Sequence, residues 1–239
     1  MIATEKPVAV VTGSSQGIGR SIALTLAADG YVVWAVARRR APLEQLIASG
    51  QHGEMIAAPC DLTEDTAVSE LAAEIAEKTP RLSALVHCAG SITHGSVADA
   101  GTQELRSEFA SNVTSAYFLT QLLLPHLTPG GTIVFLNSSQ GVRATARTSH
   151  YAASMHARRA LADSLRDEIN ERGIRVTSVY PGRTATPRQE AIYARNDWPY
   201  HPELLLQPND IADVVRAILK LASTAEVTDL HIRPATKSY

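Results

Sequence analysis

The chain has 239 residues, of which 45% are hydrophobic and 19% charged, and its formal net charge is -2 at pH 7. This composition is typical of a globular protein, and the balanced charge argues against nucleic acid or an anionic membrane as partner. No apolar run reaches the roughly 18 residues of a membrane span, and the apolar run from Val8 leaves no room for a secretory signal, so a cytoplasmic protein is expected.

Short β-branched runs alternate with longer segments of helical periodicity along the chain. The predicted strands cover residues 8–11, 31–37, 54–58, 84–87, 132–136, 175–179 and 227–232. Because these runs are continuously apolar, they predict an α/β fold with a doubly wound Rossmann-type sandwich: an about seven-stranded, mostly parallel sheet with helices on both faces. A single domain over 1–239 is expected, and the weakly patterned segment of about 183–207 is a candidate flap over a substrate.

The segment that follows the first predicted strand is rich in glycine and opens the first helix. Glycines here let the backbone turn sharply and approach a pyrophosphate, while the helix N-terminus offers free N–H groups. A plain strand–helix turn is the alternative, but the position within an N-terminal βαβ unit favours a dinucleotide. The candidate cofactor-binding residues are Gly13, Ser15, Gln16, Gly17, Ile18 and Gly19.

Charged residues follow the second and third predicted strands. Arg38 and Arg39 come directly after the second strand, where a carboxylate would favour NAD(H) and a guanidinium a 2′-phosphate. They predict NADP(H) in preference to NAD(H), with a solvated start to the next helix as the alternative. Asp61 could accept the adenine amino group, or could merely precede a helix capped at Thr63.

Several motifs stand in one order along the chain and together resemble the short-chain dehydrogenase/reductase family. They are Thr12-Gly13-x-x-x-Gly17-Ile18-Gly19, Asp61-Leu62, His87-Cys88-Ala89-Gly90, Ser111-Asn112-Val113, Ser138 with Gly141, Tyr151, and Pro181-Gly182-x-Thr184-x-Thr186. Asn-Asn-Ala-Gly is the usual family sequence at 87–90, so this chain keeps only the Ala-Gly pair.

The resemblance implies an oxidoreductase that acts on a small-molecule carbonyl or secondary alcohol with NADP(H). Tyr151 would transfer the proton, Ser138 would polarise the substrate oxygen and Asn112 would order a relay water. The further cofactor contacts implied are Leu62, Ala89, Gly90, Tyr151, Pro181, Gly182, Thr184 and Thr186. Family members usually form homodimers or homotetramers through two long helices, here 102–127 and 151–172. No metal is expected, because the histidines show no ligand spacing.

Met155 stands one helical turn after Tyr151, where the family carries a lysine. The lysine ammonium stabilises the tyrosinate and binds the nicotinamide ribose, and a methionine thioether does neither. Loss of effective acid–base catalysis lowers a rate by about 10²–10⁴. His150 and His94 could approach Tyr151 from outside the helix, whereas Arg158 and Arg159 lie roughly 10–12 Å further along the helix axis.

Three interpretations of Met155 stay open: a slow enzyme, a cofactor-binding or scaffold protein without catalysis, and an altered version of a lysine-bearing parent. Each proposed catalytic residue also has a structural interpretation. Ser138 could be a turn serine, Tyr151 a packing residue, and Asn112 a polar residue that bends a long helix. A regulatory α/β domain without nicotinamide is disfavoured by the arginines after the second strand.

Overall fold

Seven parallel strands form one sheet in this computed structural model, which describes residues 6–49 and 53–236. The strand order is β3-β2-β1-β4-β5-β6-β7, and every neighbouring pair is parallel. The strands are β1 Val8–Thr12, β2 Val32–Ala37, β3 Met55–Pro59, β4 Leu82–His87, β5 Leu127–Leu136, β6 Arg175–Pro181 and β7 Asp229–Ile232. The predicted fold class is confirmed.

Helices connect the strands and cover the sheet. They are α1 Gly17–Ala28, α2 Arg40–Ala48, α3 Asp65–Lys78, α4 Thr102–Phe109, α5 Ser115–Leu123, α6 Ser149–Ile169, α7 Pro187–Arg195 and α8 Pro208–Leu219. A π-helical turn, Ala110–Thr114, joins α4 to α5, so the helix predicted over 102–127 is one helical run with a widened turn at its centre, and it ends before Leu127, where β5 begins. Within the described ranges, no helix is long and apolar enough to cross a membrane.

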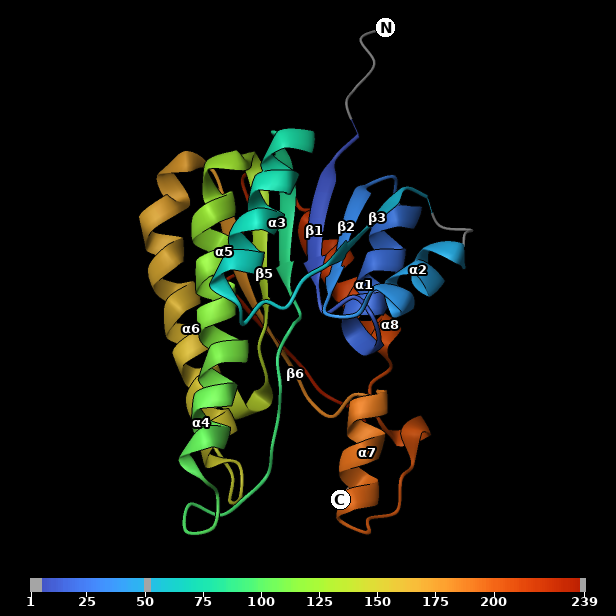
Figure 1. The fold of residues 1–239 in the computed structure, drawn as a ribbon, viewed down its shortest axis with the longest axis vertical. Coiled ribbons are helices and arrows are strands. Elements are labelled where there is room, and N and C mark those ends of the chain that lie inside the picture. The colour runs from blue at the N-terminus through green and yellow to red at the C-terminus, as the bar shows by residue number, and fades with distance from the viewer. Residues whose placement is uncertain (1–5, 50–52, 237–239) are drawn as a thin grey trace, which may run out of the picture.

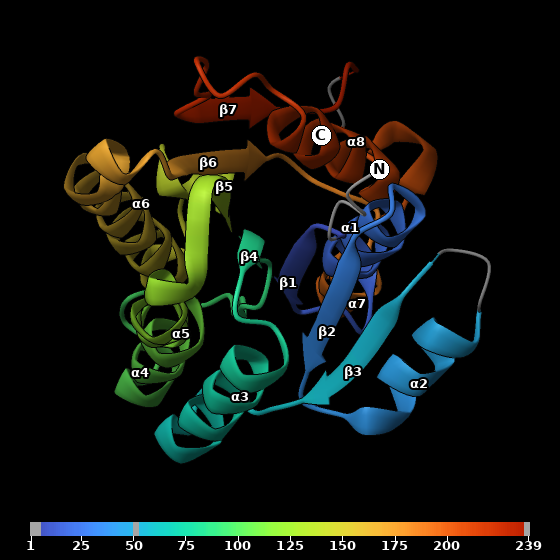
Figure 2. The ribbon, with the colours of Figure 1, turned by 90° about the horizontal axis from the view of Figure 1, so that it is seen from above.

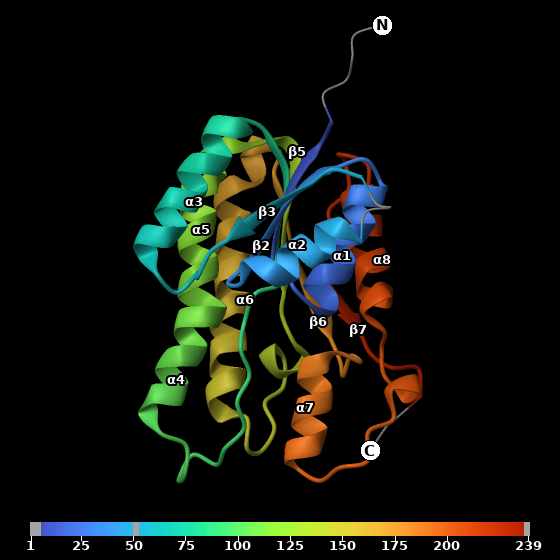
Figure 3. The same ribbon diagram turned by 45° about the vertical axis from the view of Figure 1, so that its right-hand side comes forward.

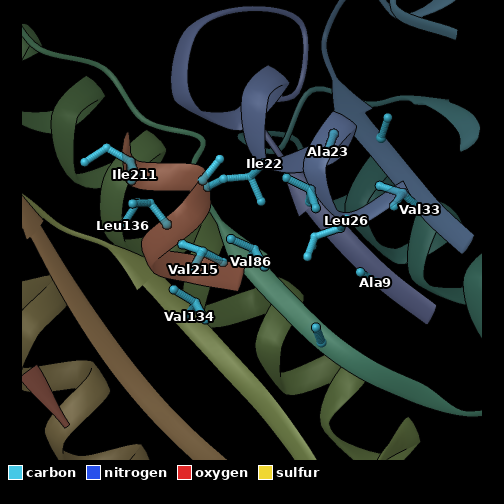
Figure 4. Packing of buried hydrophobic residues seen from close by; sticks show 14 of the residues in the cluster. Ala9, Ile22, Ala23, Leu26, Val33, Val86, Val134, Leu136, Ile211 and Val215 are labelled. Carbon is cyan, nitrogen blue, oxygen red and sulfur yellow. The ribbon is translucent and has the colours of Figure 1, made fainter. Parts of the chain in front are cut away.

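The two faces of the sheet carry separate hydrophobic cores. On one face α1, α2 and α8 pack against the strands, and their contacts include Ile22, Leu26, Ile211 and Val215 (Figure 4). On the other face α3, α5 and α6 bury residues such as Leu119. Viewed from above, the helices flank the twisted sheet as two layers (Figure 2). Continuously apolar strands therefore result from burial on both faces.

The carboxyl ends of the strands meet at one edge, and the order in which strands are added to the sheet reverses between β1 and β4. The sheet grows from β1 through β2 to β3 on one side and from β1 through β4 to β7 on the other. Helix α7 stands beyond this edge (Figures 1 and 3). A switch point of this kind places a crevice outside the strand ends, which is where α/β proteins bind ligands.

Two local elements differ from the sequence expectation. The segment 183–207, expected to be weakly patterned, contains α7, which begins at Pro187 after the Thr186 hydroxyl accepts a hydrogen bond from the Gln189 N–H at 3.1 Å. Helix α3 begins at Asp65 with Glu64 as its N-cap, so Thr63 does not cap it. Thr63 instead donates its N–H and hydroxyl to the Asp61 carboxylate.

Candidate active site

The turn after β1 is shaped for close approach of a ligand. Gly13 and Gly17 have φ of +71° and +57°, a left-handed conformation that favours glycine. A Cβ on Gly13 would lie 3.0 Å from the Ala89 nitrogen, so the turn lies directly against the segment that follows β4. No side chain caps the N-terminus of α1, which leaves its first N–H groups to face an anion.

A cavity of about 400 Å³ opens over this turn and over the ends of β2, β3 and β4. The sequence-predicted cofactor residues that line it are Gly13, Ser15, Gln16, Gly17, Ile18, Gly19, Arg38, Arg39, Asp61, Leu62, Ala89, Gly90 and Thr186. The groups in this cavity match the phosphates of a dinucleotide. The glycine backbone and the uncapped N–H groups of α1 suit the pyrophosphate, and the guanidiniums of Arg38 and Arg39 suit a further phosphate. The residues present therefore fit such a cofactor.

Asp61 is fixed at the edge of this cavity. Its Oδ1 accepts hydrogen bonds from the Thr63 N–H at 3.0 Å and the Thr63 hydroxyl at 2.7 Å. These bonds hold the pKa of the Asp61 carboxyl below its usual range, with a smaller effect from Arg38. Asp61 therefore presents an ionised carboxylate at neutral pH, which can accept a further hydrogen bond.

Ser138 and Tyr151 line a second cavity of about 430 Å³, together with the predicted residues Pro181, Gly182, Thr184 and Thr186. Ser138 lies two residues after the end of β5, and Tyr151 lies in the first turn of α6. Ile18, Thr186 and Arg188 border both cavities, so the second cavity adjoins the first. The structure thus places Ser138 and Tyr151 in a cavity that adjoins the candidate cofactor site.

Opposing effects act on the Tyr151 phenol. Burial raises its pKa above the ordinary value, while a hydrogen bond with Ser138 and the positive charges of Arg188 and Arg158 lower it. Glu108 raises it. The phenol is therefore protonated at neutral pH, as an acid that gives a proton to a substrate must be, and the arginines favour the phenolate left behind.

Asn112 lies in the π-helical turn, is fully buried and lines neither cavity within the described chain. Its amide nitrogen donates to Glu108 Oε2 at 2.7 Å, to the Ser154 hydroxyl at 2.9 Å and to the Ser91 carbonyl at 3.1 Å. Its oxygen accepts from the Ser91 N–H at 2.7 Å. Asn112 thus braces α6 against the segment after β4, and the structure does not bring it to the substrate cavity.

Met155 is buried at 2% exposure, and its carbonyl accepts a hydrogen bond from the Asn137 amide at 3.2 Å. Arg158, one turn further along α6, is equally buried and donates to the carbonyl oxygens of His87 and Ala89 at 2.7 and 3.1 Å. A helix places side chains that are seven residues apart on one face, so the spacing from Tyr151 could have identified Arg158 as a residue near the site. No sequence pattern marked Asn137 or Arg188 in this way.

The second cavity is basic. Arg147, Arg183 and Arg188 border it, and none of its described lining residues carries a carboxyl group. Arg188 donates to the Gly90 carbonyl at 2.7 Å, and Arg183 donates to the Tyr193 hydroxyl at 3.3 Å. Apolar surface comes from Ile92, Ile192 and Trp198, while Tyr200 and His201 do not line this cavity.

Known proteins resemble this chain over nearly all of its length. The family described as short chain dehydrogenase matches residues 7–197. An uncharacterised oxidoreductase of Mycobacterium tuberculosis is 35% identical and covers 98% of this chain and 93% of its own. A second protein of that organism, an uncharacterised NAD-dependent oxidoreductase, is 29% identical over 87% of each chain.

Two solved structures share the fold closely. The alcohol dehydrogenase of the archaeon Thermococcus sibiricus, complexed with 5-hydroxy-NADP, has a TM-score of 0.87 at 26% identity and covers 98% of this chain and 100% of its own. A short chain dehydrogenase of Burkholderia cenocepacia in complex with NADP has a TM-score of 0.83 at 28% identity, covering 95% and 96%. With the family match spanning residues 7–197, this chain belongs to the short-chain dehydrogenase/reductase family.

Proposed function

We propose that this protein is an NADP(H)-dependent oxidoreductase that interconverts a carbonyl compound and the corresponding secondary alcohol. The observation that carries the proposal is the adjacency of the two cavities, because Ser138 and Tyr151 lie where the inner end of a dinucleotide in the first cavity would meet a substrate in the second. The nicotinamide, when bound, supplies or accepts the hydride at its C4 position.

The chain's own residues handle the proton. In the reductive direction Tyr151 gives its phenolic proton to the substrate oxygen, so C=O becomes CH–OH and Tyr151 becomes a phenolate that takes a proton back from water. Ser138 hydrogen-bonds to the phenol and lines the same cavity, so it orients the substrate oxygen. Met155 offers no charge to the phenolate, so the proposal includes a lowered rate.

The first test compares NADPH consumption by the chain and by Tyr151→Phe on a panel of aldehydes and ketones. The phenylalanine variant keeps the ring but has no proton to give, so we expect the rate to fall by about 10²–10⁴. Tyr117→Phe is the matched control, because Tyr117 is 52% exposed and borders neither cavity. Equal rates in all three proteins would contradict the role of Tyr151.

NADP(H) is proposed over NAD(H) because Arg38 and Arg39 border the first cavity at the end of β2. A charged hydrogen bond is worth about 1.5–3 kcal/mol, so Arg38→Gln is expected to weaken NADPH binding roughly 10- to 100-fold and leave NADH binding little changed. Arg40→Gln is the control, since Arg40 pairs with Glu44 at 3.9 Å and does not border the cavity. Equal loss for both cofactors would contradict the preference.

Met155 favours a second candidate, a cofactor-binding protein without turnover. The two functions separate when the chain is compared with Met155→Lys on the same carbonyl panel. Turnover by the unchanged chain supports the enzyme, and a gain in the lysine variant measures the penalty of Met155. NADPH binding without turnover by the unchanged chain would support the silent binder instead.

A further inference from the structure

Arg158 is a buried cation without an acidic partner. Its side chain is 2% exposed, and among the described residues its guanidinium donates to the backbone carbonyls of His87 and Ala89 and lies 5.8 Å from the centre of the Phe135 ring. No ion pair involves Arg158 within the described part of the chain, whereas Arg159, the next residue, pairs with Asp163 at 3.7 Å. Burying a charge without a counter-ion is unfavourable, so a buried guanidinium at this position suggests a functional role.

The guanidinium reaches back along α6 toward the turn that carries Tyr151. Helical side chains lean toward the helix N-terminus, which offsets part of the roughly 10 Å axial separation between positions 151 and 158. A Cβ on Gly90 would lie 3.8 Å from Arg158 Nη1 and 2.6 Å from Asn112 Oδ1, so the guanidinium lies close to Asn112. Asn112 bonds to Ser154, and the Ser154 hydroxyl donates to the Tyr151 carbonyl at 2.8 Å. These contacts place the charge beside the first turns of α6.

The charge stays on Arg158 at physiological pH. Burial lowers the guanidinium pKa from 12.5 to about 10, which is still well above neutrality. The titratable groups that its charge acts on are Cys88, Tyr151 and His87, and burial together with this charge holds the His87 imidazole neutral by lowering its pKa. Burial raises the pKa of the Cys88 thiol to about 12, so this thiol is neutral, and the proposed reaction ionises only Tyr151.

The geometry points to Arg158 as a residue that supplies a buried positive charge which stabilises the Tyr151 phenolate. This inference rests on the proposed function and deepens it, because it explains how a site without the family lysine retains proton transfer. Arg158 acts through Tyr151 and is a positioning residue. It borders neither cavity in the described structure, so it does not replace a contact with the cofactor ribose.

The charges on other elements that act on the pKa of Tyr151 are Arg188 on α7, which also favours the phenolate, and Glu108 on α4, which opposes it. His94, Arg147 and Arg183 line the same cavity as Tyr151. Arg188 is exposed and bonded to the Gly90 carbonyl, so water screens its charge. Of the charges of Arg188, Glu108 and Arg158, that of Arg188 has the largest effect on the pKa of Tyr151 and that of Arg158 the smallest, but Arg158 is buried, so water and salt screen its charge less. A test must change Arg158 while Arg188 and Glu108 stay in place.

The experiment titrates Tyr151 without substrate or cofactor. The absorbance of ionised phenol is followed against pH in each protein and in the same protein carrying Tyr151→Phe, and the difference reports Tyr151 alone. We expect Arg158→Gln to raise the Tyr151 midpoint by about one pH unit or more and Arg158→Lys to leave it nearly unchanged. Arg159→Gln is the matched control and is expected to leave the midpoint unchanged.

The kinetic arm measures the pH profile of carbonyl reduction. Arg158→Gln is expected to lower kcat on the order of ten- to a hundredfold with little change in the KM for NADPH. Adding Met155→Lys to Arg158→Gln is expected to restore the lost rate and the titration midpoint, because a new cation then stands one turn from Tyr151. Absence of turnover in every protein would contradict the proposed function, while the titration would still test Arg158.

A structural role for Arg158 gives a different result. If the guanidinium only holds the turn after β4, then Arg158→Gln lowers the melting temperature and weakens NADPH binding, but the Tyr151 midpoint does not move and Met155→Lys does not restore the rate. That outcome would overturn the inference. If Arg158→Gln alone does not fold, Met155→Lys is compared with Met155→Lys/Arg158→Gln, where the same upward shift of the midpoint is expected.

Discussion

Tyr151 shows how a single phenol can be prepared for proton transfer by groups from several elements. Burial disfavours its ionised form, and hydrogen bonding to Ser138 together with the charges of Arg188 and Arg158 favours it. These contributions come from the end of β5, from α7 and from α6 itself. Tertiary packing therefore sets the pKa of the acid in the proposed reaction. An uncharged residue at position 155 removes only one of the several contributions to that pKa.

The cysteines provide a prediction at the scale of the residue. Burial raises the thiol pKa of Cys60 to about 11 and of Cys88 to about 12, although both residues border the first cavity. Because the thiolate is the reactive form, we expect neither thiol to be alkylated by iodoacetamide at pH 8 in the folded protein, and both to react after unfolding. Mass spectrometry of the alkylated peptides measures this, and rapid labelling of native Cys88 would show a lowered pKa.

The elements that could be predicted from sequence are those with a strong local pattern. The seven strands were predicted from short runs rich in apolar and β-branched residues, and Gly173, with φ of +69°, ends the run of α6 as expected. Strand β5 begins at Leu127, earlier than predicted. The prediction started late because Pro129, Gly130 and Gly131 interrupt the apolar run on which it relied. Helix α7 was missed because its buried face is short, with Ile192 and Tyr193.

Site residues were predictable only where a backbone signal or a family motif marks them. The glycines and arginines that line the first cavity lie directly after strands, so topology alone brings them to one edge. Arg158 was discounted because axial distance ignores the length and lean of an arginine side chain. The resemblance implies that Asn112 orders a relay water, which stays a prediction, and hydrogen bonds to Glu108, Ser154 and Ser91 fix its amide inside the structure.

At the scale of elements, α7 and the loops before α6 and after β6 give the second cavity its charge. Arg188 comes from α7, Arg147 from the loop before α6 and Arg183 from the loop after β6, and no described lining residue offers a carboxylate. We expect a ketone that carries a carboxylate to have a lower KM than its methyl ester, with Arg147→Gln and Arg188→Gln each raising the KM of the acid roughly tenfold or more. Steady-state kinetics on the pair measures this.

Arg143→Gln serves as the control for these substitutions, because Arg143 is exposed on the same loop and does not border the cavity. A KM for the acid that rises equally in the Arg143 variant would indicate long-range charge in place of a local contact. An ester preferred over the acid would contradict the expectation outright.

Asp29 fixes α1 to α8 by charge. Its carboxylate accepts from Lys220 Nζ at 2.9 Å and from Arg216 Nε at 3.0 Å, and the Lys220 hydrogen bond is the main cause of its lowered pKa. A carboxyl group whose pKa is lower in the folded state stabilises the fold at pH values above its unfolded pKa of about 4. This stabilisation is lost as the pH falls through the pKa of the folded state. Because its partners are half-exposed, we expect Asp29→Asn to lower the free energy of unfolding by only about 0.5–1 kcal/mol at pH 7 and by less at pH 3.

Urea unfolding at the two pH values measures this difference. Asp213→Asn is the control, because Asp213 approaches the same Arg216 at 3.7 Å with a side chain that is 70% exposed, and it should change stability little at either pH. A loss in Asp29→Asn that stays constant between pH 7 and pH 3 would mean that packing, and not charge, carries the effect.

For the whole molecule, the sheet and the candidate site depend on the same strands. The turn after β1 and the turn after β4 are joined by Thr12, whose hydroxyl accepts from the N–H groups of Cys88 and Ala89, each at 3.0 Å. A ligand that fills the first cavity would therefore bridge both halves of the sheet, β1 to β3 and β4 to β7. Binding there is therefore expected to increase the stability of the entire fold.

Cofactor binding should accordingly raise the melting temperature. A ligand at a hundredfold its Kd adds about 2.7 kcal/mol to the free energy of unfolding, which for a protein of this size is roughly 5–10 °C. At equal concentrations we expect NADPH to raise the melting temperature more than NADH, Arg38→Gln to remove this difference, and Tyr151→Phe to retain it. Scanning calorimetry measures all three. No shift with either cofactor would exclude both the enzyme and the silent binder, because each requires the first cavity to hold a dinucleotide.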